Sequence, residues 1–194
     1  MNMVRVYMER YEPAFGAEKR ELEHRIGLKL LCQGLKDLYG IEPENGEAPL
    51  MRKGSHGKPC LTDFPQIHFN ISHTEGRAVC AVGEGALGID IERVHPYRYS
   101  LLKRVLSESE RLRMAELSEE ERSRYFFRIW TLKESYGKAK GCGLMNPLTD
   151  ISFDLRADGN IRCSVPGLFF YQKMLEEEYI LSLCTFVKEE ISFA

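Results

Sequence analysis

The sequence lacks the long apolar runs that mark membrane proteins and secreted precursors. No stretch approaches the roughly 18 consecutive apolar residues that a membrane-spanning helix requires. Residues 1–8 alternate between apolar and polar side chains, and they contain no continuous apolar core of a signal peptide. We therefore expect a cytoplasmic protein that has no membrane partner.

Paired cysteines and zinc motifs are also missing. The six cysteines lie far apart and form no CxxC pair: Cys32, Cys60, Cys80, Cys142, Cys163 and Cys184. A zinc site would require closer ligand spacing, and residues 78–82 place a cysteine inside an apolar run that is typical of a strand. Buried free thiols in a reducing compartment are therefore favoured over a disulfide framework.

The chain has no strong excess of either charge. It contains 27 lysines and arginines against 29 aspartates and glutamates, which gives a net charge of −2. General nucleic-acid binders normally have a strongly basic face, so we expect no nucleic-acid partner. A length of 194 residues with 43% hydrophobic composition is sufficient for a good core, in one large domain or two small ones.

The first half of the chain is predicted to run strand, long helix, strands. Alternation predicts a strand over residues 4–8, and helical spacing of leucines predicts a helix over 17–38 that Gly40 ends. Residues 41–58 are rich in glycine, proline and charge, and they are predicted to form a loop. Further strands are predicted over residues 66–71, 77–83 and 86–92.

The second half repeats this order. Ser107 and Ser118 can each start a helix, and the second helix is predicted to run to about Lys140, before Gly141 and Gly143. Strands are then predicted over residues 151–155, 161–165, 168–173 and 179–187, with a hairpin turn at Asp158-Gly159.

The repeated order predicts an α+β fold. Two α+β halves of similar plan are expected, residues 1–84 and residues 85–194, joined near Glu84. No sequence identity connects the halves, so their common plan is inferred from the order of elements.

Two segments could bring acidic side chains together. Alternation places Asp90 and Glu92 on one face of a strand. Helical spacing aligns Trp130, Glu134 and Lys138 along one stripe. Alone, each carboxylate is typical of a solvated surface and Trp130 is typical of a packing residue. Together, three carboxylates and a lysine suit a hard cation such as Mg²⁺ that holds a phosphate ester.

Other polar residues could contact phosphates. Ser72 and His73 follow a predicted strand, where they could bind phosphate oxygens or form a turn with the backbone, and the sequence does not separate the two. Lys58 could act as a point charge on a phosphate, although exposed lysines are usually solvated. Arg25, on the first helix, is compatible with a surface position.

Four segments together resemble the ordered motifs of the Sfp-type 4′-phosphopantetheinyl transferases. They cover roughly residues 55–145, and the strand pattern of the tail also fits this family. The segments are Gly57-Lys58-Pro59, Phe69-Asn70-Ile71-Ser72-His73-Thr74, Gly88-Ile89-Asp90-Ile91-Glu92 and Trp130-Thr131-Leu132-Lys133-Glu134-Ser135-Tyr136-Gly137-Lys138.

The resemblance implies a reaction. Such enzymes transfer the 4′-phosphopantetheine group of coenzyme A to a serine of an apo acyl or peptidyl carrier protein, release adenosine 3′,5′-bisphosphate and use magnesium. It also implies a monomer with a pseudo-twofold arrangement and an active site in the cleft between the halves. Two alternatives remain open from the residues alone: a magnesium-dependent phosphohydrolase, and a non-catalytic protein that binds coenzyme A or a carrier.

The resemblance also implies roles by position. Asp90, Glu92 and Glu134 would hold Mg²⁺, and Glu134 would also accept the serine proton. Lys138 would neutralise charge that develops on the phosphates. The implied contacts of coenzyme A are Arg25, which would reach the 3′-phosphate, and Lys58, Ser72 and His73.

Two further expectations concern basic residues. The region between the first strand and the long helix is shorter than is usual in the family, where it supplies more contacts to the 3′-phosphate, so Lys19 or Arg20 is a candidate substitute. A basic stretch could dock an acidic carrier protein or be solvated on a helix face, and it comprises Arg98, Lys103, Arg104, Arg111 and Arg113.

Overall fold

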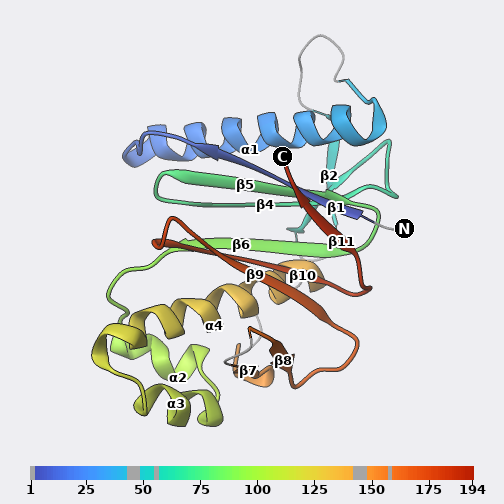
Figure 1. The fold of residues 1–194 in the computed structure, drawn as a ribbon. Coiled ribbons are helices and arrows are strands. Elements are labelled where there is room, and N and C mark those ends of the chain that lie inside the picture. The colour runs from blue at the N-terminus through green and yellow to red at the C-terminus, as the bar shows by residue number, and fades with distance from the viewer. Residues whose placement is uncertain (1–2, 43–48, 55–56, 142–147, 157–158) are drawn as a thin grey trace.

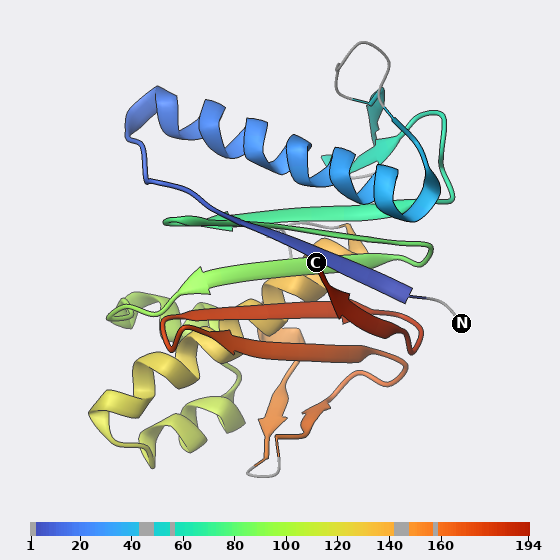
Figure 2. The ribbon, with the colours of Figure 1, turned by 45° about the horizontal axis from the view of Figure 1, so that its top comes forward.

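The fold consists of two sheets that pack against each other, each covered by a helix. The structure is a computed structural model, and it describes residues 3–42, 49–54, 57–141, 148–156 and 159–194. In Figures 1 and 2, helix α1 (Gly16–Tyr39) covers one sheet and helix α4 (Glu119–Lys140) covers the other, with both sheets between them. The mixed helix and sheet content confirms the predicted α+β class. No helix in the described ranges is both long enough and apolar enough to cross a membrane.

The first sheet holds four strands in the order β11-β1-β5-β4. Strand β5 (Arg77–Gly83) pairs antiparallel with both β1 (Met3–Arg10) and β4 (His68–Thr74). Strand β11 (Glu190–Phe193) returns from the end of the chain and runs parallel to β1. In Figures 1 and 2 the first and last strands of the chain, β1 and β11, both lie in this sheet.

The second sheet has the order β6-β10-β9. Strand β10 (Tyr179–Thr185) lies between β6 (Leu87–Arg93) and β9 (Phe169–Leu175), antiparallel to both. Two short ribbons complete the strands: β2 (Met51–Lys53) with β3 (Pro59–Leu61), and β7 (Phe153–Leu155) with β8 (Ile161–Cys163). The smaller helices are the 3₁₀ turn η3 (Tyr99–Leu101), α2 (Leu102–Val105), α3 (Glu108–Ala115) and the 3₁₀ turn η5 (Leu148–Asp150).

The two halves repeat one topology. In the first, β1 leads through α1 to β4 and β5, and β5 lies in the middle of the three strands. In the second, β6 leads through the helical segment that ends in α4 to β9 and β10, and β10 lies in the middle. This match supports the duplicated plan. The exact division at residue 84 stays a prediction, and β11 lies in the first half's sheet although it belongs by sequence to the second half.

An apolar layer joins the sheets face to face. It contains Val4, Val6, Val79 and Ala81 from the first sheet, and Leu87, Ile89, Ile91, Leu181 and Leu183 from the second. Burying a valine, leucine or isoleucine side chain is worth about 1.5–3 kcal/mol, so this layer is a large part of what holds the halves together. This layer also determines which way the side chains of β6 point. Ile89 and Ile91 lie in the apolar layer, so Asp90 and Glu92, on the opposite face of the strand, point toward α4.

Several predicted elements are confirmed. Strand β5 has the predicted bounds, and the helices that start after Ser107 and Ser118 both have the capping box, in which each serine bonds to the backbone N–H three residues on. Helix α4 ends at Gly141, whose φ of 75° is in the left-handed region that glycine tolerates. Gly143 and Asp158 lie outside the described residues. The described cysteines, Cys32, Cys60, Cys80, Cys163 and Cys184, are free thiols.

Other predictions were wrong in detail. The predicted loop over 41–58 contains β2, and residues 72–74, which were expected to follow a strand, continue β4 to Thr74. Strands β3 and β11 and helix α2 were not predicted. Each has only three or four residues, so a period of 2 or 3.6 has no room to appear.

Candidate functional site

The candidate site is built where β4, β6 and α4 meet. Helix α4 lies on β6 at Gly88, where an added Cβ atom would come 2.2 Å from both Ala139 N and Ser135 O. Only glycine permits this approach, since backbone atoms cannot move aside as a flexible side chain can. Gly88 therefore brings Glu134 and Lys138 of α4 close to the acidic face of β6.

Side chains of β4 bond to the backbone of β6 across the junction between the sheets. The Ile89 N–H donates to Asn70 Oδ1 at 2.9 Å, and the Arg93 N–H donates to Thr74 Oγ1 at 3.3 Å. Between them, the Ile91 N–H donates to Ser72 Oγ at 3.4 Å. Alternate side chains of β4 thus take the place of carbonyl oxygens in a strand ladder, and they hold β6 in a fixed register.

Asp90 is the centre of the site. It is only 4% exposed, and its Oδ1 atom accepts hydrogen bonds from Ser72 Oγ at 2.9 Å and from Lys138 Nζ at 2.7 Å. Lys138 Nζ also donates to Ser72 Oγ at 2.8 Å, which closes a triangle. Asp90 Oδ2 is buried and has no hydrogen-bond partner in the described part of the chain. The predicted residues Ser72, Asp90 and Lys138 are therefore brought together.

Glu92 and Glu134 flank Asp90 and feel its charge. Burial, and then the nearby charge of Asp90, raises the pKa of each carboxyl from its ordinary value of 4.5 to about 7. Glu134 Oε1 is buried without a hydrogen-bond partner among the described residues, whereas Glu92 accepts a hydrogen bond from Thr74 Oγ1 at 3.2 Å. Negative charge is thus in excess at this site.

The carboxylate oxygens of this site are of the type that a hard divalent cation binds, although they do not converge on one point. No three carboxylate, histidine or cysteine side chains in the described ranges converge closely enough to hold a metal ion. Two buried carboxylate oxygens, Asp90 Oδ2 and Glu134 Oε1, nevertheless lack partners within the described part of the chain, and Mg²⁺ takes oxygen ligands of this kind. Asp90, Glu92 and Glu134 remain the predicted metal ligands.

Trp130 lies beside Glu92, a place that a packing interpretation misses. Its side chain lowers the pKa of that carboxyl, against the larger effects of burial and of the Asp90 charge. Its ring also packs against Phe126, with 5.9 Å between centroids. The spacing of Trp130 one turn before Glu134 was the available signal for a place beside the carboxylates.

His73 faces a carboxylate that the sequence analysis did not single out. His73 Nδ1 lies 3.2 Å from Oε2 of Glu23, which is buried on α1. His73 points toward α1, whereas its neighbour Ser72 points toward β6, because side chains alternate along β4. The two residues therefore border the site from different faces of one strand.

Lys58 and Arg25 were predicted to contact coenzyme A together with Ser72 and His73, but the structure places them elsewhere. Lys58 Nζ donates to Leu87 O at 2.7 Å and to Ala139 O at 3.5 Å, so its ammonium group bonds to the start of β6 and the end of α4. Arg25 is exposed on α1 two residues after Glu23, which is roughly 200° around the helix from it. The structure does not bring Arg25 to His73, and its contact with coenzyme A stays a prediction.

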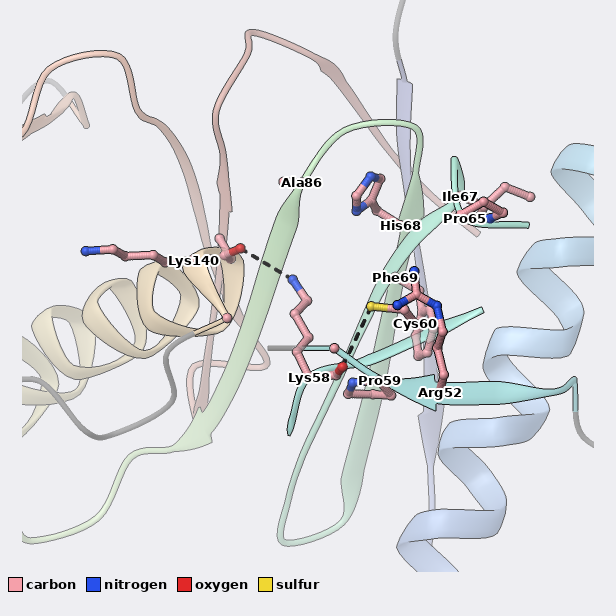
Figure 3. Close-up of a pocket in the computed structure, with 13 residues that line it drawn as sticks. Arg52, Lys58, Pro59, Cys60, Pro65, Ile67, His68, Phe69, Ala86 and Lys140 are labelled. Atoms are coloured by element: carbon pink, nitrogen blue, oxygen red, sulfur yellow. Dashed lines mark hydrogen bonds between the residues drawn. The ribbon is translucent and has the colours of Figure 1, made fainter. Parts of the chain in front are cut away.

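A basic cavity of about 250 Å³ lies beside Lys58 (Figure 3). Its described lining includes Arg52, Lys58, His68 and Lys140, and no carboxylate. Figure 3 shows the Lys58 side chain extended toward the end of α4. Burial, and then the charge of Lys58, lowers the pKa of His68, as expected where cations are crowded. The cavity thus suits an anionic group.

Two arginines of the predicted basic stretch form bonds within the protein. Arg111 donates to Leu106 O at 2.7 Å, and Arg113 pairs with Glu116 at 2.6 Å. The remaining members are exposed: Arg98, Lys103 and Arg104. Docking of a carrier protein on this stretch stays a prediction.

Lys133, the residue before Glu134, is buried in an ion pair. Its Nζ atom lies 2.6 Å from Glu110 Oε2 and 2.7 Å from Val105 O, and the side chains of Lys133 and Glu110 are 0% and 1% exposed. Glu110 also accepts hydrogen bonds from the N–H groups of Ser107 and Phe153. The pair therefore ties α4 to α2, α3 and β7 directly behind Glu134.

Comparison with known proteins gives one consistent result. A model of the 4′-phosphopantetheinyl transferase superfamily matches residues 86–184. A 4′-phosphopantetheinyl transferase of Bacillus subtilis is 32% identical over 191 residues, which cover 91% of this chain and 84% of that protein. The 4′-phosphopantetheinyl transferase Sfp of Bacillus subtilis (strain 168) is 38% identical over 111 residues, which cover 57% of this chain and 50% of that protein.

A solved structure is also similar in part. It is a holo-(acyl-carrier-protein) synthase from Bacillus anthracis in complex with CoA (3′,5′-ADP), with a TM-score of 0.44 and 21% identity. The similarity covers 51% of this chain and 92% of that chain.

The chain belongs to the 4′-phosphopantetheinyl transferase superfamily. It is an Sfp-type 4′-phosphopantetheinyl transferase, an enzyme that moves the phosphopantetheine group of coenzyme A onto a carrier protein.

Proposed function

We propose that Asp90, Glu92, Glu134 and Lys138 form the active site that transfers 4′-phosphopantetheine from coenzyme A to a serine of an apo carrier protein. The observation that carries this proposal is a pair of buried oxygens, Asp90 Oδ2 and Glu134 Oε1, that have no partner among the described residues and lie beside the Lys138 ammonium group. Such a site has unused capacity for both a cation and a phosphate. In the proposed arrangement Asp90, Glu92 and Glu134 would hold Mg²⁺, which when bound neutralises charge on the pyrophosphate.

The reaction is a displacement at phosphorus. The serine Oγ forms a bond to the β-phosphorus, the bond from that phosphorus to the bridging oxygen breaks, and adenosine 3′,5′-bisphosphate leaves with the electron pair. Glu134 accepts the serine proton, and in the metal-free site burial and the charge of Asp90 raise its carboxyl pKa to about 7. Lys138 is placed to offset charge on the phosphate oxygens, and catalysis is otherwise largely a matter of positioning.

Coenzyme A would lie between the halves. Ser72 bonds to Asp90, His73 is partly exposed on the other face of β4, and the basic cavity beside Lys58 offers a place for an anionic group. We further propose a cytoplasmic monomer that binds neither nucleic acid nor membrane. The net charge of −2 supports the first of these exclusions.

The direct test is a mass measurement on the carrier. The protein is mixed with coenzyme A, Mg²⁺ and an apo carrier protein, and the intact mass of the carrier is recorded. A gain of one phosphopantetheine group supports the proposal. Breakdown of coenzyme A without a carrier would indicate a phosphohydrolase, and binding of coenzyme A with no change in several carriers would indicate a binding protein.

Replacing Glu134 by glutamine should lower the rate constant kcat by roughly 10²–10⁴-fold, which is the usual effect of losing a general base. Glutamine keeps the shape of the side chain but cannot accept the serine proton. Initial rates with varied coenzyme A separate kcat from KM. A variant that keeps a normal kcat, with KM alone raised, would show that Glu134 acts only in binding.

The stabilisation that Mg²⁺ provides should grow as the pH rises from about 6 to about 8. The carboxyls of Glu92 and Glu134 have pKa values raised from 4.5 to about 7, so between these values the folded protein holds more protons than the unfolded chain. The metal-free protein therefore loses stability as the pH rises through this window. Mg²⁺ binds the ionised form and releases the protons, so it offsets that loss.

Thermal unfolding at a fixed Mg²⁺ concentration measures this effect. The increase in Tm caused by Mg²⁺ is compared at the two pH values in one buffer series. Equal increases at both values would contradict the proposed ligands. Asp90→Asn is a matched comparison, because it removes the charge that, after burial, raises both pKa values, so the pH dependence should weaken.

A further inference from the structure

Glu23 is a buried carboxylate on the apolar face of α1. It is 4% exposed and belongs to the same buried face as Ile26, Leu30 and Leu31. A carboxylate in such a position is costly to bury unless hydrogen bonds and opposite charges compensate it. Its partners therefore indicate why it is there.

The partners of Glu23 come from three elements. Oε1 lies 2.9 Å from the hydroxyl of Tyr11, just after β1, and that hydroxyl is also 2.7 Å from Thr74 O of β4. Oε2 lies 3.2 Å from Nδ1 of His73, and Lys19 Nζ lies 3.7 Å from Oε1. The carboxylate is thus fixed from one side by Tyr11 while its other oxygen faces the imidazole ring.

This geometry favours one nitrogen of the His73 ring for its proton. The Glu23 carboxylate oxygen is an acceptor 3.2 Å from Nδ1, so its negative charge favours the proton on Nδ1. In the neutral ring the other nitrogen, Nε2, is then an acceptor. The side chain of His73 is 46% exposed, so a ligand can reach it. A phosphate oxygen is also an acceptor, and two acceptors do not form a hydrogen bond.

We propose that Glu23 is a positioning residue that makes the binding of coenzyme A depend on the uptake of a proton. Glu23 keeps one proton on Nδ1 of His73. Nε2 must therefore take up a second proton from solvent when it donates to a phosphate of coenzyme A. The inference rests on the proposed function, in which His73 contacts coenzyme A. The bound state is an imidazolium ring between two anions, the Glu23 carboxylate and the phosphate. Each charge-assisted hydrogen bond then stabilises the other through the shared ring.

The surroundings of His73 favour a neutral ring before the ligand binds. Burial is the main cause that lowers the pKa of His73, and the charges that act on it are Glu23 and Lys19 of α1, Lys138 of α4 and Asp90 of β6. Glu23 and Asp90 oppose the lowering, while Lys138 and Lys19 add to it. The second proton is therefore absent near neutral pH and is taken up when a phosphate arrives.

Two measurements on the full-length wild-type protein test the inference directly. Long-range ¹H–¹⁵N spectra report the tautomer of each of the five histidines, with His73→Gln for assignment. We expect the Nδ1–H tautomer in the free protein and a doubly protonated ring with coenzyme A. Calorimetric titration of coenzyme A at saturating Mg²⁺, in buffers of different ionisation enthalpy, gives the protons taken up, and subtraction of His73→Gln isolates the proton of this residue.

The variant Glu23→Gln tests the positioning role. Its amide can instead donate to Nδ1, which releases the ring to the Nε2–H tautomer, so the difference in proton uptake should vanish. Above about pH 7 the KM for coenzyme A should rise roughly tenfold, the factor that corresponds to one pKa unit, while kcat at saturation stays near wild type. Glu18→Gln makes the same change at an exposed site on the same helix and should leave KM unchanged.

Each outcome decides the inference. An Nε2–H tautomer in the free wild-type protein, or a KM in Glu23→Gln equal to that in Glu18→Gln, overturns it while carrier modification continues. Loss of both coenzyme A binding and carrier modification in the wild-type protein would instead overturn the proposed function, and the inference with it.

Discussion

Replacing Asp90 by alanine is expected to abolish phosphopantetheine transfer while the protein remains folded. Asp90 bonds to both Ser72 and Lys138, and among charged groups it has the largest effect on the pKa of Glu92 and of Glu134. Its loss removes one proposed metal ligand and the anchor of the Lys138 ammonium group together. We expect a fall in kcat/KM of at least the roughly 10³-fold that loss of a preorganised electrostatic contact costs.

The fold should tolerate this change. Lys138, which loses its partner, is 27% exposed on its side chain, so water can solvate its charge. Ser72 is 5% exposed and its hydroxyl loses Asp90 Oδ1 as its acceptor, which should cost about 1–3 kcal/mol of stability without unfolding the protein. Circular dichroism and Tm check the fold, and the carrier mass assay measures transfer. Asp154→Asn, which changes an exposed carboxylate on β7, is the control and should transfer normally.

Asp90→Asn separates charge from shape. The amide keeps a hydrogen-bond acceptor for Lys138 but removes the negative charge, so the carboxyl pKa of Glu134 should fall toward its ordinary value. The acidic limb of the pH–rate profile should then move to lower pH. A folded Asp90→Ala variant that transfers at the rate of the Asp154→Asn control would rule out the metal site and Asp90 as its centre.

The sequence predicts well which side chains of the strand and of the helix share a face at this site, because that depends on local periodicity. Alternation around Asp90 and Glu92 and the helical stripe through Glu134 and Lys138 are local patterns, and the structure follows both. Gly88 completes the site for a reason that is not local. Its missing side chain matters only because the backbone of α4 comes to lie against it.

The polar residues of β4 show where sequence patterns fail. Serine, histidine and threonine in a row are typical of a turn, yet Ser72 and Thr74 accept hydrogen bonds from the backbone of β6. Their partners lie some 19 residues away along the chain, so only the packing of the two sheets makes them strand residues. Local propensity cannot report such a partner.

The helical period around Arg25 and Glu23 contains information that the sequence prediction left out. The apolar spacing of Leu22, Ile26 and Leu30 defines the inner face of the first helix. Glu23 lies next to this face and Arg25 lies away from it, so the helical period alone places the glutamate inward. A charged residue on an apolar face is a candidate for a specific partner, here His73.

Lys133→Met is expected to lower the free energy of unfolding by about 3–5 kcal/mol, the usual effect of removing one partner from a buried ion pair. Methionine fills a similar volume, so the loss comes from charge rather than from a cavity. Glu110 would remain 1% exposed without its cation, with hydrogen bonds from the N–H groups of Ser107 and Phe153. Urea unfolding, analysed for both midpoint and slope, measures the change.

Lys29→Met is the matched control for this effect. Lys29 pairs with Glu9 at 2.7 Å, but its side chain is 65% exposed, so its removal should cost no more than about 1 kcal/mol. The double variant Lys133→Met/Glu110→Gln should regain part of the lost stability, because it no longer buries an unpaired charge. If Lys133→Met were no less stable than Lys29→Met, the pair would not hold α4, and the position of Glu134 would depend on Gly88 and the apolar contacts of α4 instead.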